Sequence, residues 1–364
     1  MAALADEPHH WSEAEAGQWY ARQAWLVGAN YIPSSAVNQL EMWQQDTFDP
    51  LAIDRELGWA EELGMNTARV FLHDLLWKRD SAGFEKRLNL FLKIADKHHI
   101  KPIFVLFDSV WDPCPEYGPQ PAPRPGVHNS RWVQSPAAAA LMDTHRWDEL
   151  LAYVQGLLTD FARDKRILAW DLWNEPDNTN GGSYAATDAA GKEKLVAQLL
   201  PRVFDYARAA LPSQPLTSGL WQGDWSSREK MSAVAQIQLD NSDVISFHNY
   251  DPPEEFTKRV EALAQYHRPI ICTEYMARPR GSTFQAILPI AKKNNVGAIN
   301  WGLVAGRTQT YLPWDSWQKP YVDHEPAVWF HEILDKDGKP YSLEEVRFIQ
   351  TITARNAAKP AKGK

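Results

Sequence analysis

Short apolar runs of strand length alternate along the chain with longer segments in which apolar residues recur every three or four positions. The first pattern is typical of buried strands, and the second is typical of helices with one buried face. Regular alternation of the two predicts an α/β fold built on a parallel sheet. The predicted strands cover residues 25–31, 66–73, 101–107, 167–176, 215–220, 244–250, 269–275 and 296–302.

Helical periodicity fills the gaps between these strands. In the segment 86–98, for example, Leu88, Phe91, Leu92 and Ala95 share one face. Eight strands with intervening helices predict a single (β/α)8 TIM barrel with elaborated βα loops. The predicted helices cover residues 54–63, 86–98, 144–164, 192–210, 228–238, 254–266 and 283–294.

We expect the barrel to occupy residues 21–355, between an N-terminal extension at 1–20 and a disordered tail at 356–364. The first six residues contain the Ala-x-Ala pattern that ends a secretion signal, but no apolar segment precedes it. They fit either the remnant of a removed leader or a disordered start. We expect a secreted or periplasmic protein, with a cytoplasmic location as the open alternative.

Composition narrows the class of protein. The 364 residues are 44% apolar and 23% charged, which allows one large core. A net charge of −8 argues against a nucleic-acid partner, and no apolar run is long enough to predict a membrane span. Two cysteines make no disulfide framework, so Cys114 and Cys272 are both expected to be free. The 17 Trp residues suit packing against sugar rings, although about two thirds of them are expected in the core.

Two predicted strands end in a glutamate. The strand at 167–176 ends in Asn174-Glu175-Pro176, and the strand at 269–275 ends with Glu274 just before its last residue. A lone Glu at a strand end is often a surface charge, but α/β barrels keep their chemistry at the carboxyl ends of their strands. Two carboxylates presented from two strand ends are the minimum equipment for hydrolysing a glycosidic bond.

Polar or aromatic residues recur at the ends of the other predicted strands as well. Single members of this set have plainer explanations, such as a structural ion pair for Arg69 or a buried phenol for Tyr250. Their convergence on one face of a barrel favours an active site assembled from many strands. The set consists of Asn30, Arg69, Asp108, Asn174, Glu175, His248, Tyr250, Glu274 and Trp301.

The segment 108–136 is long, irregular and carries seven prolines. A loop of this length inside a compact domain is usually functional or disordered. Its aromatic residues Trp111, Tyr117 and Trp132 favour an ordered wall over one side of the carboxyl face. Such a wall would shorten the cleft and favour short oligosaccharides or chain ends.

Other motifs indicate little chemistry. His98 and His99 suit the end of a helix, where they interact with its dipole. The segment 335–338 resembles the start of a calcium loop but lacks the later ligands, so a turn is expected. Phosphate loops, zinc motifs and nucleophile elbows are absent from the sequence, and we expect neither a metal nor a cofactor.

The chain resembles the retaining clan-A glycoside hydrolases, most closely the cellulase-type glycoside hydrolase family 5. The residues that carry the resemblance are Arg69, Asn174-Glu175-Pro176, His248-x-Tyr250, Glu274 and Trp301, in the order of the family. The resemblance implies that Glu175 is the acid/base, Glu274 the nucleophile, and Asn174 a ligand of the sugar 2-hydroxyl. Where the family commonly has a His after the third strand, this chain has Phe107-Asp108-Ser109, which leaves the identity of the sugar open.

We therefore expect a monomeric, retaining β-glycoside hydrolase that cleaves β-linked oligo- or polysaccharides of the glucan, mannan or xylan type. Transglycosylation on the same substrates and a catalytically inactive carbohydrate-binding barrel are the alternatives, and endo or exo action is open. In the expected site, Arg69 or Tyr250 favours an ionised Glu274, whose charge raises the pKa of Glu175. The expected substrate-binding residues are Asn30, Arg69, Asp108, Trp111, Asn174, His248, Tyr250 and Trp301.

Overall fold

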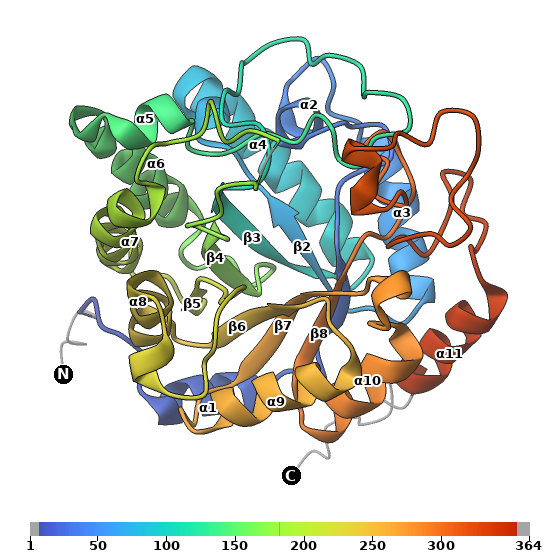
Figure 1. Cartoon of the computed structure of the whole chain (residues 1–364). Coiled ribbons are helices and arrows are strands. Elements are labelled where there is room, and N and C mark those ends of the chain that lie inside the picture. The colour runs from blue at the N-terminus through green and yellow to red at the C-terminus, as the bar shows by residue number, and fades with distance from the viewer. Residues whose placement is uncertain (1–6, 182, 355–364) are drawn as a thin grey trace.

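Eight parallel strands form the centre of the molecule, with helices around them (Figure 1). The structure is a computed structural model that describes residues 7–181 and 183–354. The strands are β1 (Val27–Asn30), β2 (Thr67–Phe71), β3 (Lys101–Asp108), β4 (Ala169–Asn174), β5 (Leu216–Thr217), β6 (Ile245–Asn249), β7 (Ile270–Tyr275) and β8 (Gly297–Trp301). Each falls inside a predicted strand or extends it by one residue.

The sheet curls into a barrel. Its strands are hydrogen-bonded in the order β5-β4-β3-β2-β1-β8-β7-β6, which leaves β5 and β6 to meet. They meet beyond the end of β5, where Leu220 bridges Phe247. The Leu220 N–H donates to the Ser246 carbonyl at 3.0 Å, and the His248 N–H donates to the Leu220 carbonyl at 2.8 Å. The predicted (β/α)8 barrel is confirmed.

The helices that follow the strands bury their apolar faces against the barrel. They are α3 (Pro50–Glu62), α4 (Asp74–Lys97), α6 (Trp147–Phe161), α7 (Lys192–Ala209), α8 (Ala233–Asn241), α9 (Pro253–Ala264) and α10 (Phe284–Lys293). The helix α4 begins twelve residues before its predicted start and is kinked at Asp80. Helices that the sequence pattern did not predict are α1 (Glu13–Ala21), α2 (Gln39–Trp43), α5 (Ala138–Met142) and α11 (Leu343–Thr353).

The helix α1 packs on the barrel. Its buried residues Ala16, Trp19 and Tyr20 form one cluster with apolar side chains that lie at or near the amino ends of the strands. The Tyr20 hydroxyl also donates to the carbonyl of Asn295 at 3.0 Å, just before β8. The apolar side chains that pack against α1 in this cluster are Leu26, Ile103, Leu168, Ala169, Val244, Ile271 and Ile299. The expected division at residue 20 falls within this helix, and the expected tail at 356–364 lies outside the described residues.

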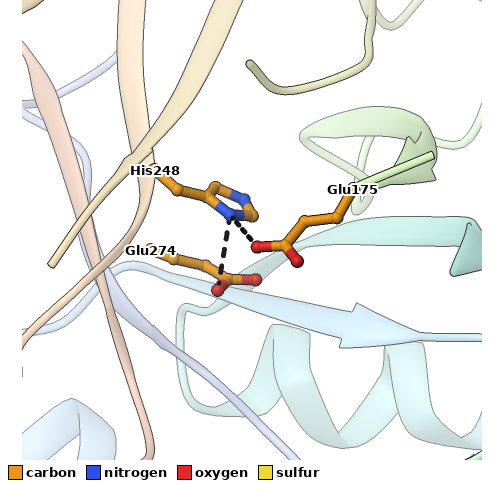
Figure 2. Close-up of side chains that lie close together, drawn as sticks. All are labelled: Glu175, His248 and Glu274. Atoms are coloured by element: carbon orange, nitrogen blue, oxygen red, sulfur yellow. Dashed lines mark hydrogen bonds and ion pairs between the residues drawn. The ribbon is translucent and has the colours of Figure 1, made fainter. Parts of the chain in front are cut away.

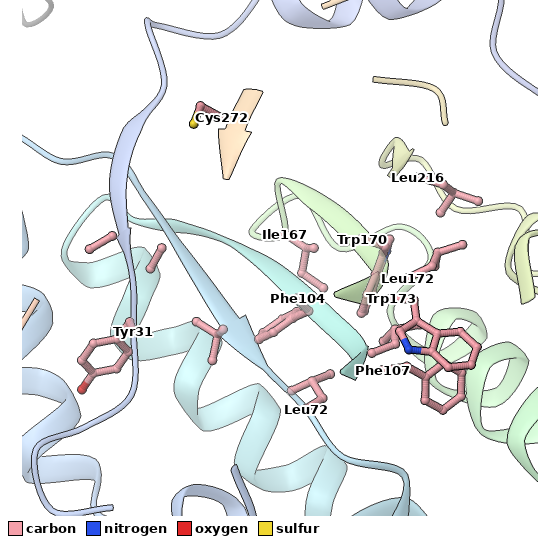
Figure 3. Packing of buried hydrophobic residues seen from close by; sticks show 14 of the residues in the cluster. Tyr31, Leu72, Phe104, Phe107, Ile167, Trp170, Leu172, Trp173, Leu216 and Cys272 are labelled. Atoms are coloured by element: carbon pink, nitrogen blue, oxygen red, sulfur yellow. The ribbon is translucent and has the colours of Figure 1, made fainter. Parts of the chain in front are cut away.

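Large aromatic side chains fill the layer around β3 and β4 (Figure 3). Phe104 packs on Trp170 with ring centroids 5.7 Å apart, and Phe107 packs on Trp173 at 5.2 Å. All four are fully buried, so each removes a large apolar area from water and fixes the position of its strand. Cys272 is buried in β7 and Cys114 is exposed, and both are free, as predicted.

The loop after β3 is ordered, as predicted. Its end returns to its beginning, because the Asp108 N–H donates to the Ser135 carbonyl and the Ser135 N–H donates back to the Asp108 carbonyl. Trp132 is buried in this loop, Trp111 is half-buried and Tyr117 is exposed. Among the described helices, none combines the length and apolar character that crossing a bilayer requires.

Candidate active site

A cavity of about 560 Å³ lies at the carboxyl end of the barrel. This volume falls in the range of roughly 300–1,000 Å³ that small-molecule sites occupy. Both predicted glutamates line it, together with Asp108, Trp111, Asn174, His248, Tyr250 and Trp301. The structure therefore brings together eight of the ten residues that the sequence predicted for the site.

Glu175 follows directly on β4, in a backbone conformation that is rare for a residue with a side chain. Its φ angle is +42°. Backbone strain of this kind persists where the surrounding structure imposes it, and it concentrates at functional sites. Asn178 donates from Nδ2 to Oε2 of Glu175 at 2.6 Å, and His248 Nδ1 lies 2.9 Å from Oε1. The carboxyl group is thus held on both oxygens.

Glu274, in β7, faces Glu175 across His248 (Figure 2). Arg69 donates from Nη1 to Oε1 of Glu274 at 2.8 Å, and the Tyr250 hydroxyl donates to Oε2 at 2.7 Å. His248 Nδ1 lies 3.5 Å from the same Oε2. A carboxylate oxygen of Glu175 lies within 4.8 Å of one of Glu274.

The two carboxyl groups differ in their surroundings. Burial raises the pKa of Glu175 to about 7, against the opposing effects of Asn178 and Arg69. Burial also raises the pKa of Glu274, but Arg69 and Tyr250 oppose that rise through direct hydrogen bonds. The predicted rise in the pKa of Glu175 is confirmed. The predicted cause of that rise was the charge of Glu274, and this part of the prediction is wrong, because burial of the Glu175 carboxyl group is the main cause.

Arg69 does not line the cavity but forms hydrogen bonds to residues that do, among them Glu274 and Asn174. The side chain is fully buried, and Nε and Nη2 both donate to Oδ2 of Asp171 at 2.9 and 2.8 Å. Nη1 donates to Asn30 as well as to Glu274. Arg69 and Asn30, both predicted to bind substrate, are not among the residues that line the cavity, and Arg69 instead holds Glu274 and Asn174, which do line it.

Asn174 is fixed by Arg69 and Asp108. Its Oδ1 accepts from Nη2 of Arg69 at 2.7 Å, and its Nδ2 donates to Oδ1 of Asp108 at 2.9 Å. An amide nitrogen carries two hydrogens, so one donor of Asn174 is left for a ligand in the cavity. Asp108 also accepts from Nε1 of Trp132 at 2.6 Å, and burial raises the pKa of Asp108 to about 7.

Aromatic rings supply the apolar surfaces of the cavity. Trp301 packs edge-on against Phe71 and Trp132, with centroids 5.7 and 5.9 Å apart. Trp111 stacks on Trp317, a residue of the loop after β8, at 4.8 Å and 18° between the rings. Flat apolar faces of this kind suit the apolar faces of sugars.

Sequence reasoning missed the lining residues that lie in loops or helices rather than at strand ends. The signal available for them was weak: the amide pair Asn178 and Asn180 closely follows Glu175, and aromatic residues are dense in the loop after β8. The missed lining residues include His128, Asn129, Asn178, Thr179, Asn180, Trp221, Asp251, Arg259, Arg280, Trp314 and His331.

Glu175, His248 and Glu274 are also the group of described side chains that could hold a metal ion. Their other contacts favour acid–base chemistry instead. Both oxygens of Glu274 already accept hydrogen bonds, one of them from the permanently charged Arg69. A cation bound there would have to compete with a guanidinium for the same carboxylate.

Comparison with known proteins places the chain by its fold. No protein-family model matches the chain, and no curated protein matches it either. Among solved structures, a variant of GH5_18 from Streptomyces cattleya in complex with Manβ1-4GlcNAc matches with a TM-score of 0.65 and 13% identity, over 93% of this chain and 82% of that one.

Two further solved structures carry names that describe their activity. The exo-β-1,4-mannosidase Op5Man5 from Opitutaceae bacterium strain TAV5 matches with a TM-score of 0.58 and 20% identity, over 92% of this chain and 61% of that one. An endo-β-1,4-mannanase from Thermotoga petrophila matches with a TM-score of 0.59 and 13% identity, over 95% of this chain and 80% of that one. At these identities the likeness establishes a shared barrel fold, in agreement with the predicted resemblance to glycoside hydrolase family 5.

Proposed function

We propose that this protein is a retaining β-glycoside hydrolase that cleaves β-linked oligo- or polysaccharides. The observation that carries the proposal is the pair Glu175 and Glu274, whose nearest oxygens lie within 4.8 Å. Retaining enzymes hold their carboxyl groups about 5–5.5 Å apart, whereas inverting enzymes need roughly 6.5–9.5 Å to admit a water between them. The close pair supports retention.

The environments of the two groups support separate roles. Glu274, held by Arg69 and Tyr250, attacks the anomeric carbon, and the glycosidic bond breaks as the glycosyl-enzyme bond forms. Glu175, whose pKa of about 7 keeps it protonated in weakly acidic solution, gives its proton to the leaving oxygen. It then takes a proton from the water that hydrolyses the glycosyl-enzyme. The sequence of steps needs these two side chains and water.

The substrate class follows from the walls of the cavity. Trp111, Trp132 and Trp301 line the cavity with aromatic surface that suits a sugar ring, and the free amide hydrogen of Asn174 is available to a sugar hydroxyl. Glucan, mannan and xylan types share this chemistry, and the mannosidase and mannanase with the same fold favour a β-mannoside. We further propose that the protein acts as a monomer, in the periplasm or the medium.

Trapping of the covalent intermediate tests this function. A panel of activated 2-fluoro β-glycosides should inactivate the enzyme, and peptide mapping should find the label on Glu274. Proton NMR of an aryl glycoside reaction should show the β-anomer as the first sugar product. An α-anomer as first product, or a label on any other residue, contradicts the assignment.

The same glycosides distinguish the proposed hydrolase from two alternative functions, a transglycosylase and a non-catalytic carbohydrate-binding barrel. A transglycosylase forms the same intermediate but passes the sugar to an added sugar acceptor, so its products grow longer when acceptor is supplied. A carbohydrate-binding barrel without catalysis binds the glycosides and never becomes labelled. The presence of both glutamates in the cavity favours the enzyme.

A further inference from the structure

The two loops that follow β3 and β8 are joined to each other across the mouth of the barrel. The Asn129 N–H donates to the Thr308 carbonyl at 2.8 Å, and the Tyr321 N–H donates to the Gly126 carbonyl at 2.9 Å. The His128 N–H donates to Oγ of Ser316 at 2.9 Å. Because β1 and β2 lie between β3 and β8 in the sheet, the joined loops lie at the barrel mouth on the side of β1 and β2 (Figure 1).

Trp111 and His128 line the cavity on this side, and Trp317 packs on Trp111; we name these three residues the end wall. Trp111 stacks on Trp317 at 4.8 Å and meets His128 edge-on at 6.3 Å. The loop after β4 joins the wall through Tyr184, which contacts Trp317 at 5.7 Å. The Trp111 N–H also donates to Oδ1 of Asn180 at 2.6 Å. Three loops thus fix the position of the end wall.

The opposite side of the cavity is built differently. Its two connections differ in length: residues 250–252 alone connect β6 to α9 (Pro253–Ala264), whereas residues 218–232 connect β5 to α8. Its lining residues include Trp221, Asp251 and Arg259. The cavity is therefore bordered by long loops above β3 and β8 and by a short connection after β6.

The proposed chemistry fixes which sugar meets the end wall. The sugar attacked by Glu274 must rest on Trp301 and reach the free amide hydrogen of Asn174. Those residues adjoin Trp132, which contacts Trp301 at 5.9 Å in the loop that carries the wall. The sugar that leaves must lie beside Glu175. The loop of Glu175 contacts both sides of the cavity, Trp221 through Asp177 at 2.7 Å and Trp111 through Asn180 at 2.6 Å, so the leaving sugar takes the side that Trp301 and Trp132 do not occupy. The end wall stands on the side of the attacked sugar.

We infer that the enzyme is exo-acting: it removes single sugars from the non-reducing end of a chain, because the end wall leaves no path for a chain beyond the attacked sugar. The inference rests on the proposed function and adds to it the class of substrate. A chain end enters over the short connection after β6, and the rest of the chain leaves over the same connection.

Two buried histidines equip the closed end to recognise a free terminus. His128 donates from Nδ1 to the Leu312 carbonyl at 2.8 Å, and His331 donates from Nδ1 to the Met276 carbonyl. Each ring is thereby fixed in the tautomer whose Nε2 accepts a hydrogen bond. Both rings line the cavity, with centroids 5.5 Å apart. Two acceptors suit the free hydroxyls of a terminal sugar, one of which is replaced by a linkage in an interior sugar.

Product analysis tests the inference. β-1,4-Linked manno- and gluco-oligosaccharides should lose one sugar at a time from the earliest time points, and reduction of their reducing ends should change nothing. Methylation of the terminal 4-hydroxyl should abolish cleavage. Internal fragments at early times, or equal cleavage of methylated chains, overturn exo action while leaving the glycosidase intact. Failure to cleave any aryl β-glycoside would instead overturn the proposed function.

Variants of the wall supply the second test. Trp317→Ala removes the ring on which Trp111 stacks, which should let Trp111 move and open the closed end, so that cleavage of the methylated chains appears relative to that of an aryl monosaccharide. Tyr117→Ala, in the same loop system but exposed, is the matched control and should keep the original product pattern. An unchanged pattern in a folded Trp317→Ala protein contradicts the inference.

A less disruptive variant, His128→Asn, tests the same inference if Trp317→Ala does not fold. His128→Asn keeps a donor near the Leu312 carbonyl but removes the Nε2 acceptor. It should raise KM for unmethylated oligosaccharides by about five- to tenfold, the worth of one hydrogen bond. The kcat on an aryl glycoside with an acidic phenol serves as the reference for the chemical step. An unchanged KM contradicts a role for His128 at the chain end.

Discussion

The hydroxyl of Tyr250 donates a hydrogen bond of 2.7 Å to Oε2 of Glu274. Tyr250 stands at the end of β6 and Glu274 within β7, so neighbouring strands of the barrel set the contact. Burial favours the neutral form of Glu274, and this donated hydrogen bond favours the charged form. The pair therefore controls how much of the proposed nucleophile is ionised.

Tyr250→Phe should shift the acidic limb of the pH–activity profile to higher pH. Without the donor the pKa of Glu274 rises, so a higher pH is needed to ionise it. At a pH below the new limb kcat/KM should fall by about 10- to 100-fold, the worth of a hydrogen bond to a charged group. Tyr266→Phe is the control. The Tyr266 hydroxyl contacts Sδ of Met231 at 3.9 Å, and Tyr266 does not line the cavity. Identical acidic limbs in the two variants would sink the idea.

The alkaline limb should report Glu175. Above a pH of about 7 its carboxyl loses the proton that the leaving oxygen requires, so activity should fall as the pH rises. Asn178→Ala removes a donor that stabilises the charged form, which should raise the pKa of Glu175 and move the alkaline limb upward. Thr187→Ala, an exposed change in the same loop, should leave the limb in place. A downward move after Asn178→Ala is the opposite of what this geometry predicts.

The two glutamates should fail in different ways. Glu274→Ala should lose activity on every substrate by several orders of magnitude, because a nucleophile cannot be bypassed. Glu175→Ala should lose activity on natural sugars but keep the first step on aryl glycosides with acidic phenols, which leave without a proton. Added azide should then release the β-glycosyl azide from Glu175→Ala. Azide rescue of Glu274→Ala to the β-product, with none for Glu175→Ala, would reverse the roles.

Arg69 should matter for stability as well as activity. Arg69→Met leaves Asp171 and Glu274 buried without their cation, which should lower the free energy of unfolding by about 3–5 kcal/mol. Arg202→Met breaks a solvent-exposed pair with Asp148 and should cost about 1 kcal/mol or less. Urea unfolding of both variants measures the difference. Equal losses would mean that the buried network contributes no more than a surface pair.

The barrel could be predicted because periodicity is a local property. All eight strands are apolar runs bounded by polar residues, and Gly64 ends α3 with the left-handed backbone, φ +75°, that its capping role requires. The helix α11 escaped prediction because few of its residues are apolar and buried, and its buried set includes Glu345 and Thr353. Its place depends on contacts that periodicity does not report.

The site could be predicted only where its residues lie on strands. Glu175, Glu274 and Tyr250 follow from their positions at strand ends, since parallel strands bring those ends to one face. Whether a side chain lines the cavity or supports the residues that line it depends on three-dimensional packing, which the sequence pattern does not report for Arg69 and Asn30. His128 comes from a loop whose path is set by partners about 180 residues away, such as the carbonyl of Leu312.

The packing of α1 under the barrel has a kinetic consequence. Trp19 and Tyr20 precede all eight strands in the chain, and their partners range from Leu26 to Ile299, with the Tyr20 hydroxyl meeting Asn295 at a separation of 275 residues. Contacts of such range form late, because the intervening chain must be ordered first. During synthesis the docking site of α1 is therefore incomplete until β8 is in place, and part of its aromatic surface stays available to chaperones while the barrel is being made.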